Sequence, residues 1–257
     1  MALLDVKNLS IQFGGLKAVT DFNLSLEEGE LVAIIGPNGA GKTTVFNMLT
    51  GLYKPTEGDI LFNGSSLVGL KPHDFTERGI ARTFQNIRLF NNATVLDNIK
   101  IAFTLQVKYS LGEALFRTRK YHNVEDDLEI KSMELLKILS LDGKADFLAK
   151  NLPYGEQRRL EIARALATNP KILLLDEPAA GMNPNEIEDL IALIKEIKEK
   201  FNLTVLLIEH HMNVVMTIAD RIKVLDFGQT IAEGIPEEIQ KNPKVIEAYL
   251  GGGHKEC

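Results

Sequence analysis

A glycine-rich turn follows an apolar run near the start of the chain. Residues 31–35 read Leu-Val-Ala-Ile-Ile, and residues 36–43 then fit the spacing Gly-x4-Gly-Lys-Thr. Such a turn between a strand and a helix leaves several backbone N–H groups aimed at one point, beside the positive end of the helix dipole. Glycines also let the backbone approach an anion closely. The spacing therefore predicts a binding site for the phosphates of a nucleotide.

The side chains that close this turn could complete the phosphate site. We expect Lys42 to reach the β- and γ-phosphates and the Thr43 hydroxyl to hold Mg²⁺. A flexible surface turn would also fit the bare spacing, but the apolar run before it and the helix-like residues 44–50 after it favour a strand–turn–helix unit. The predicted nucleotide-binding residues of the loop are Gly36, Pro37, Asn38, Gly39, Ala40, Gly41, Lys42, Thr43 and Thr44.

Two adjacent acids, Asp176 and Glu177, follow a second apolar run. Ligands of open α/β sheets bind outside the carboxyl ends of the strands, so we expect Asp176 to hold Mg²⁺ directly or through water. Glu177 points elsewhere and is predicted to polarise the attacking water of a phosphoryl-transfer reaction. Taken alone, two such acids would more often be charges at the start of a helix. The presence of the phosphate loop in the same chain is what favours a catalytic role for these two acids.

Composition bounds the class of protein. The chain has 257 residues, of which 45% are hydrophobic and 25% charged, which suits one large soluble α/β domain with a sizeable core. The formal net charge of −6 argues against a surface that coats nucleic acid. The single cysteine, Cys257, excludes an internal disulfide framework.

The sequence contains no segment typical of export or of a membrane span. The first residues lack a basic lead followed by an apolar core and a cleavage site. No apolar run approaches the roughly 20 residues that cross a bilayer. We therefore expect no membrane span in this chain, so that any membrane role comes through partner chains.

The chain changes character along its length. Residues 3–35 alternate like antiparallel strands, expected at Leu4–Val6, Leu9–Phe13 and Phe22–Leu26. A mostly helical section follows from about residue 88 to residue 165. Apolar strands at 171–176 and 203–208 then flank an amphipathic helix, a pattern that favours a parallel sheet with helices packed on it. The predicted fold class is α/β, with a P-loop core on a parallel sheet, an N-terminal antiparallel β sub-domain and an inserted helical sub-domain.

A longer pattern is similar to that of a known family. Residues 152–157 read Leu-Pro-Tyr-Gly-Glu-Gln, residues 158–166 read Arg-Arg-Leu-Glu-Ile-Ala-Arg-Ala-Leu, and Asp-Glu-Pro follows at 176–178. Together with the phosphate loop, these segments resemble the ATP-binding cassette (ABC) family in the right order over essentially the whole chain. We call residues 152–157 the signature segment. The resemblance implies one ABC ATPase domain over residues 1–250, with ATP and Mg²⁺ as cofactors and a flexible tail at 251–257.

The resemblance also assigns roles to residues that would be unremarkable alone. Gln85 matches the glutamine that contacts Mg²⁺ and the attacking water and faces the transmembrane subunit. His210 matches the histidine that contacts the γ-phosphate, and Phe13 matches the aromatic residue that stacks on adenine. Without this context, His210 would be read as structural, Gln85 as a surface amide and Phe13 as core.

Three positions depart from the family pattern. The signature segment usually reads Leu-Ser-Gly-Gly-Gln, but Pro153 and Tyr154 here replace the serine and the first glycine. Proline suits a first helical turn but offers no hydroxyl to a phosphate, so anion binding must depend on backbone N–H groups and the helix dipole. Asn183 replaces the usual aspartate and Phe13 the commoner tyrosine.

In this family the signature segment completes the nucleotide site of a second cassette. The resemblance therefore implies that Gly155 and Glu156 act on the ATP of a partner, and that Asn183 lies in a loop that crosses to it. The pair is implied to be a homodimer or a heterodimer, with each subunit alone a weak ATPase.

Wider segments are similar to the ATPases of branched-chain amino-acid importers, among them residues 82–90, 154–164, 177–184 and 245–251. That resemblance implies two permease subunits, an external solute-binding protein and a place on the cytoplasmic face of the membrane. The ATPase of lipopolysaccharide export is the alternative. A soluble ABC protein of DNA repair or translation is disfavoured because the chain lacks a coiled-coil insertion, a second cassette and a basic surface. The basic run at 117–120 fits a solvated helix face as well as it fits a contact, either to anionic lipid or to a permease loop.

Overall fold

The computed structural model describes residues 2–107 and 109–250, so the predicted flexible tail at 251–257, with Cys257, lies outside the described residues. The chain forms two compact units. Residues up to Arg82 and from Lys171 onward make the first unit, and Thr83–Pro170 make the second. The predicted helical section at 88–165 falls inside the second unit, and the assignment of residues 1–250 to one ATPase domain stays a prediction.

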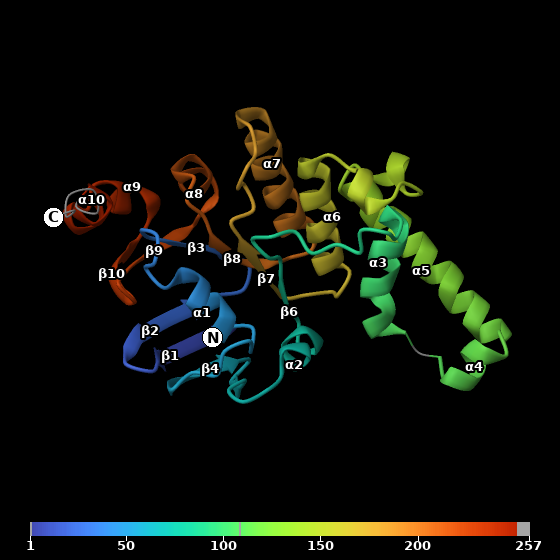
Figure 1. Ribbon diagram of the computed structural model, residues 1–257, viewed down its shortest axis with the longest axis horizontal. Coiled ribbons are helices and arrows are strands. Elements are labelled where there is room, and N and C mark those ends of the chain that lie inside the picture. Colours follow the sequence, from blue (N-terminus) through green and yellow to red (C-terminus); the bar gives the residue numbers. More distant parts are fainter. Residues whose placement is uncertain (1, 108, 251–257) are drawn as a thin grey trace. The chain divides into compact units, whose positions relative to one another are not determined.

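The first unit contains an antiparallel sheet with the strand order β2-β1-β4-β5 (Figure 1). Its strands are β1 (Leu4–Phe13), β2 (Leu16–Leu26), β4 (Glu57–Phe62) and β5 (Ser65–Ser66). The two strands predicted within residues 4–13 are one strand, because the register shift between Val6 and Leu9 is absorbed at Asn8, whose φ is 49°. This bulge interrupts the alternation of apolar residues without ending the strand.

The second sheet of this unit has the order β10-β9-β3-β8-β7-β6 and is parallel except for β10. Its strands are β3 (Leu31–Ile35), β6 (Ile80–Arg82), β7 (Ile172–Asp176), β8 (Thr204–Ile208), β9 (Arg221–Asp226) and β10 (Gln229–Gly234). Every residue of β3, β7 and β8 is buried, as expected for parallel strands that are covered on both faces. The predicted fold class is confirmed.

Six helices accompany these sheets among the described residues of the first unit. They are α1 (Lys42–Met48), α2 (Pro72–Glu77), α7 (Pro184–Lys200), α8 (Met212–Ile218), α9 (Pro236–Gln240) and α10 (Pro243–Leu250). Helix α1 lies between the two sheets, where Val45 and Phe46 join a core built from both, while α7 and α8 lie on the other side of the parallel sheet (Figure 1). Helix α1, which follows the phosphate loop, is therefore packed between the two sheets.

The second unit is helical throughout its regular structure. Its elements are α3 (Val95–Phe103), a short 3₁₀ turn (Thr104–Gln106), α4 (Leu111–Leu115), α5 (Arg119–Ile138), two further 3₁₀ turns (Asp142–Lys144 and Ala149–Asn151) and α6 (Tyr154–Leu166). Helices α3, α5 and α6 pack together around Val95, Ile99, Leu136 and Leu160, all of which are fully buried. The signature segment leads into α6.

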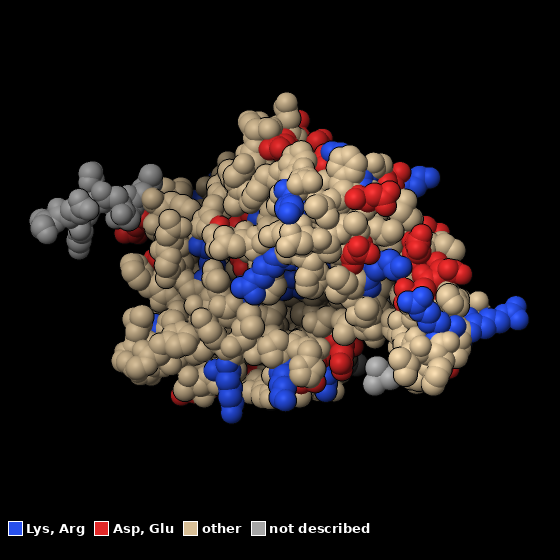
Figure 2. Space-filling model, turned by 45° about the vertical axis from the view of Figure 1, so that its right-hand side comes forward, with Lys and Arg blue, Asp and Glu red and all other residues tan. Residues whose placement is uncertain are grey.

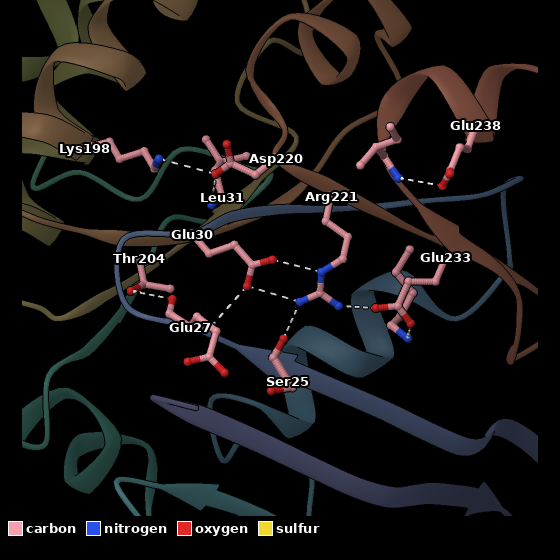
Figure 3. Close-up of polar contacts among 12 residues, drawn as sticks. Ser25, Glu27, Glu30, Leu31, Lys198, Thr204, Asp220, Arg221, Glu233 and Glu238 are labelled. Atoms are coloured by element: carbon pink, nitrogen blue, oxygen red, sulfur yellow. Dashed lines mark hydrogen bonds and ion pairs between the residues drawn. The ribbon is translucent and has the colours of Figure 1, made fainter. Parts of the chain in front are cut away.

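A polar network fixes the amino ends of the parallel strands (Figure 3). Arg221 donates from Nε to Glu30 at 2.9 Å and also bonds Glu233 and the Ser25 carbonyl. Hydrogen bonds to Glu30 raise the pKa of the Arg221 guanidinium. Asp220 accepts from the Leu31 N–H at 2.7 Å. These bonds tie the start of β3 to β9, at the end of the sheet away from the phosphate loop.

Acidic and basic side chains are interspersed on the face that Figure 2 shows. In the described part of the chain, none of the helices combines the length and the hydropathy that a bilayer crossing requires.

Candidate nucleotide site

The phosphate loop is built as its sequence predicts, between β3 and α1. Two of its positions require glycine, because the backbone of a neighbouring strand lies too close to leave room for a side chain. A Cβ on Gly36, whose φ is +151°, would lie 2.0 Å from the Leu225 carbonyl oxygen. A Cβ on Gly41, whose φ is +99°, would lie 2.8 Å from the Ala18 carbonyl oxygen. Any side chain at either position would push the loop away from β9 or β2.

Lys42 is buried at the start of α1, and its Nζ donates to the carbonyls of Gly36 and Pro37 at 2.8 Å each. Burial lowers the pKa of Lys42, and the charges of Glu177 and Asp176 partly offset this effect. Both acids are therefore near enough to act electrostatically on the lysine. Thr43, the next residue, is exposed. The loop thus brings a cation and a hydroxyl to the same end of the sheet.

Asp176 and Glu177 follow β7 at its carboxyl end, where the sequence predicts them. Asp176 is buried and forms an ion pair with Arg82, whose Nη2 atom lies 2.6 Å from Asp176 Oδ2. The backbone of Glu177 has a φ of 47°, in the left-handed region that residues other than glycine rarely adopt. Backbone strain of this kind clusters at functional sites, where the surrounding structure enforces it.

Glu177 and His210 meet in the structure. The Glu177 Oε1 atom lies 2.8 Å from His210 Nε2, and their side chains are 14% and 35% exposed. The two residues follow neighbouring strands, because β7 pairs with β8 from Ile172 to Asp176. A carboxylate and an imidazole are therefore held together at the carboxyl end of the parallel strands, the end that carries the phosphate loop, and both are accessible to solvent.

A buried acid that the sequence analysis did not select, Glu209, holds this arrangement. Its Oε1 atom accepts from the Ala179 N–H at 2.8 Å. Its Oε2 atom accepts from the N–H groups of His210 and His211 at 2.8 and 3.0 Å. Glu209 thus joins the loop after β7 to the loop after β8 and fixes the backbone of His210.

Phe13 ends β1, and its side chain is 46% exposed. Tyr53, which the sequence analysis did not select, lies beside it with a ring-centroid distance of 5.3 Å and an interplanar angle of 73°. Both rings are available to a planar ligand such as a base, so the stacking role of Phe13 stays a prediction. Local spacing could not have found Tyr53, since it comes from the segment after α1.

The remaining predicted residues lie apart in the chain. Gln85, Gly155 and Glu156 belong to the second unit. Glu156 accepts from Lys144 Nζ at 2.6 Å, and Pro153 is the N-cap residue of α6, one position before the first turn in which it was expected. Asn183 is the N-cap of α7 and accepts from the Glu186 N–H at 3.1 Å. The structure thus gives Asn183 a capping function within its own chain.

The oxygen donors at the loop suit Mg²⁺. This ion keeps several waters and is commonly bound by one or two carboxylates together with substrate phosphates, rather than by an all-protein cage. Thr43 and Asp176 supply a hydroxyl and one carboxylate, and nowhere in the described ranges do three histidine, cysteine, aspartate or glutamate side chains gather as a metal site. The donor set fits a magnesium ion that the nucleotide helps to hold.

Comparison with known proteins agrees with this geometry. The ABC transporter family model matches residues 19–180, and the model named branched-chain amino acid ATP-binding cassette transporter matches residues 229–255. The high-affinity branched-chain amino acid transport ATP-binding protein LivG of Escherichia coli strain K12 is 49% identical, over 97% of this chain and 98% of its own length.

Solved structures give the same result. The ADP conformation of MJ1267, an ATP-binding cassette of an ABC transporter, matches with a TM-score of 0.84 and 34% identity, covering 98% of this chain and 99% of that one. The dimeric post-hydrolysis structure of the cassette MJ0796, bound to ADP and Pi, matches with a TM-score of 0.76 and 28% identity, covering 91% and 98%.

A phosphate loop after an internal strand of a parallel sheet, with acids at the carboxyl end of another strand of the same sheet, defines a P-loop nucleotide-hydrolysing protein. The chain belongs to the ABC transporter family, and it is an ATP-binding ATPase subunit of that family.

Proposed function

We propose that this chain is the ATP-hydrolysing subunit of an importer for branched-chain amino acids, with Glu177 activating the attacking water. The observation that carries the proposal is the 2.8 Å contact between Glu177 and His210 at the end of the parallel sheet that holds the phosphate loop. Relatives that are 47% and 49% identical, over 97% of this chain and 98% of their own length, are named for branched-chain amino acid transport. The lipopolysaccharide-export alternative is not favoured.

Each residue of the site then has a defined task. The backbone N–H groups of residues 36–44 and the Lys42 ammonium neutralise the phosphates. Glu177 accepts a proton from water in line with the γ-phosphate, and His210 contacts that phosphate and orients the Glu177 carboxylate. Phe13, beside Tyr53, stacks on the adenine.

Mg²⁺, held by Thr43, Asp176 and Gln85, would neutralise charge that develops on the phosphates. The side chains of these three residues offer only oxygen as a ligand, which is the preference of this ion.

The proposed site is divided between two polypeptides. Gly155 and Glu156 would present the backbone N–H groups of the first turn of α6 to the nucleotide bound by a second cassette, and Asn183 would lie at the same interface. The match to the dimeric cassette MJ0796 supports this arrangement. ATP favours the closed pair because it binds that state more tightly, and hydrolysis reverses the preference.

We further propose that the pair sits on the cytoplasmic face of the membrane, beneath two permease subunits that receive amino acids from an external binding protein. Phe90, 46% exposed, lies five residues after Gln85 and would contact a permease helix. Closing of the cassettes would be transmitted through this segment.

Glu177→Gln tests the proposal. The variant keeps the shape of the side chain but accepts a proton poorly, so the subunit should bind ATP, hydrolyse it at least about 100-fold more slowly and accumulate as an ATP-bound dimer. Size-exclusion chromatography of the variant with ATP, alone and with co-expressed cassettes, measures this directly. A wild-type rate for Glu177→Gln, or a monomer with every cassette partner, would overturn the proposal.

A further inference from the structure

The segment of residues 84–90 forms neither helix nor strand. Its backbone N–H and C=O groups therefore need partners outside regular structure. Three side chains of α6 supply several of them: Arg158, Glu161 and Arg164. These residues are spaced three apart, which puts them on one face of the helix. Segment and helix belong to the same compact unit.

Arg158 binds the carbonyls on the N-terminal side of this segment. Its Nη1 atom donates to the Phe84 carbonyl at 2.6 Å, and its Nη2 atom donates to the Gln85 carbonyl at 2.9 Å. The arginine is fully buried, with a relative exposure of 0%. A buried charge is retained at such a position only when its partners are well placed, so the direction of both carbonyls is strongly constrained.

Glu161 binds the N–H groups of the same segment. Its Oε1 atom accepts from the N–H of Phe84 at 3.2 Å and from that of Arg88 at 3.3 Å. Its other oxygen accepts from Arg158 Nη1 at 2.7 Å. Burial raises the pKa of Glu161, and the charge of Arg158 with the two backbone N–H groups partly offsets this.

The far end of the segment is held in the same way. Arg164 donates to the Arg88 carbonyl, and its guanidinium lies 4.7 Å from the centre of the Phe90 ring. The Asn98 side chain accepts from the Phe90 N–H at 2.9 Å and donates to the Phe90 carbonyl at 3.1 Å. The main chain is therefore anchored on both sides of Gln85 and at Phe90.

We propose that Arg158 and Glu161 are positioning residues, which fix the main chain around Gln85 and make the 84–90 segment move with α6. The inference rests on the proposed function, in which Gln85 acts at the nucleotide. Because the Gln85 carbonyl and the Phe84 peptide are both held, the direction in which the Gln85 side chain leaves the backbone is set by α6. Any displacement of the signature segment is then passed to Gln85 and Phe90 without a flexible joint.

Tyr154, one of the residues in which the signature segment departs from its family pattern, also contacts Arg158. The Tyr154 hydroxyl accepts from Arg158 Nη2 at 3.4 Å, one helical turn before the arginine. The tyrosine at the first position of α6 thus contacts the residue that holds Gln85. A glycine at this position could make no such contact.

Glu161→Gln and Arg158→Lys are the variants that test the proposal. An amide side chain has one acceptor oxygen, so Glu161→Gln cannot serve the two backbone N–H groups and Arg158 together. A lysine keeps the charge of Arg158 but has a single nitrogen, which cannot reproduce the fork between two carbonyls. Arg158→Lys also guards against misfolding, which full removal of a buried charge would invite.

Hydrogen exchange of the full chain gives the first readout. We expect amide exchange in the peptide that contains Phe84 and Arg88 to accelerate about tenfold or more in both variants, while the helical amides of α5 keep their protection. Asp127→Ala is the matched control, since it breaks an exposed ion pair with Lys131 at 2.6 Å on α5 and touches nothing in the segment. Unchanged exchange in Glu161→Gln and Arg158→Lys would overturn the proposal.

The second readout is ATP turnover by the assembled transporter. We expect both variants to keep the ATP affinity of the wild type within about twofold and to lose about tenfold or more in kcat, because a misplaced catalytic group affects turnover more than binding. Faster exchange with wild-type kcat would also overturn the positioning role. If the wild-type assembly itself fails to hydrolyse ATP, the proposed function fails instead, and the exchange result still stands or falls independently.

Discussion

Arg82 and Asp176 form a buried ion pair across the neighbouring strands β6 and β7, with Arg82 Nη2 2.6 Å from Asp176 Oδ2. The same guanidinium donates from Nη1 to the side-chain oxygens of Asn47 and Thr50 at 2.7 and 3.2 Å. One arginine therefore connects the predicted metal-binding acid to the helix that follows the phosphate loop. Both charged side chains are at most 6% exposed.

We predict that Arg82→Met lowers the free energy of unfolding by about 3–5 kcal/mol, because it leaves the Asp176 carboxylate buried without its counter-charge. Asp176→Asn should destabilise the chain similarly, and the double variant should lose clearly less than the sum of the two. Urea denaturation with comparable m-values measures all three. Strictly additive losses in this double-mutant cycle would show that the pair is not coupled.

The lowered pKa of Lys42 predicts that ATP affinity falls as pH rises. Burial disfavours the charged ammonium in the free protein, whereas bound phosphates favour it. ATP binding therefore takes up a proton once the pH exceeds the free-protein pKa of Lys42. The dissociation constant should rise by up to about tenfold per pH unit from there until the pKa of the complex is reached. The effect on folding has the opposite sign. Because the pKa of Lys42 is lower in the folded protein than in the unfolded chain, the free energy of unfolding of the ATP-free protein should increase as pH rises from the folded-state pKa to the ordinary pKa of lysine.

Titration with a fluorescent ATP analogue from about pH 7 to about pH 10, in the presence of EDTA, follows the binding effect. Lys42→Arg is the control, since a guanidinium stays protonated throughout this range. The variant should bind with a flat profile even if its affinity is lower. An equal slope in the wild type and in Lys42→Arg would assign the pH dependence to another group.

Features that depend on local spacing could be predicted from the sequence. The phosphate loop is one, since a strand, a turn and a helix follow one another without interruption at residues 31–50. The acids after β7 are another, because a wholly apolar run indicates a buried strand, and the carboxyl end of such a strand is where ligands bind. Strand boundaries were harder, since the bulge at Asn8 breaks the alternation within β1.

Features that depend on which strands are neighbours could not be predicted. Glu209 reaches Ala179, 30 residues away, only because β7 and β8 lie side by side. Arg82 meets Asp176 across 94 residues for the corresponding reason at β6 and β7. A glutamate or an arginine beside a strand carries no local mark of such a partner, and its ordinary interpretation is a solvated charge.

The contacts of Glu209 lead to a last prediction, in which stability and turnover separate. Glu209→Gln presents an amide N–H where the carboxylate now accepts from His210, so it should lower the free energy of unfolding by about 1–3 kcal/mol. Because His210 would shift relative to Glu177, kcat should fall by about 10- to 100-fold with a much smaller change in ATP affinity. Glu30→Gln is the matched control, since it weakens the bonds of Arg221 at the far end of β3 and should cost similar stability while leaving kcat unchanged. Melting curves and steady-state ATPase rates of the two variants decide the matter: equal losses of kcat would mean that Glu209 contributes to folding alone.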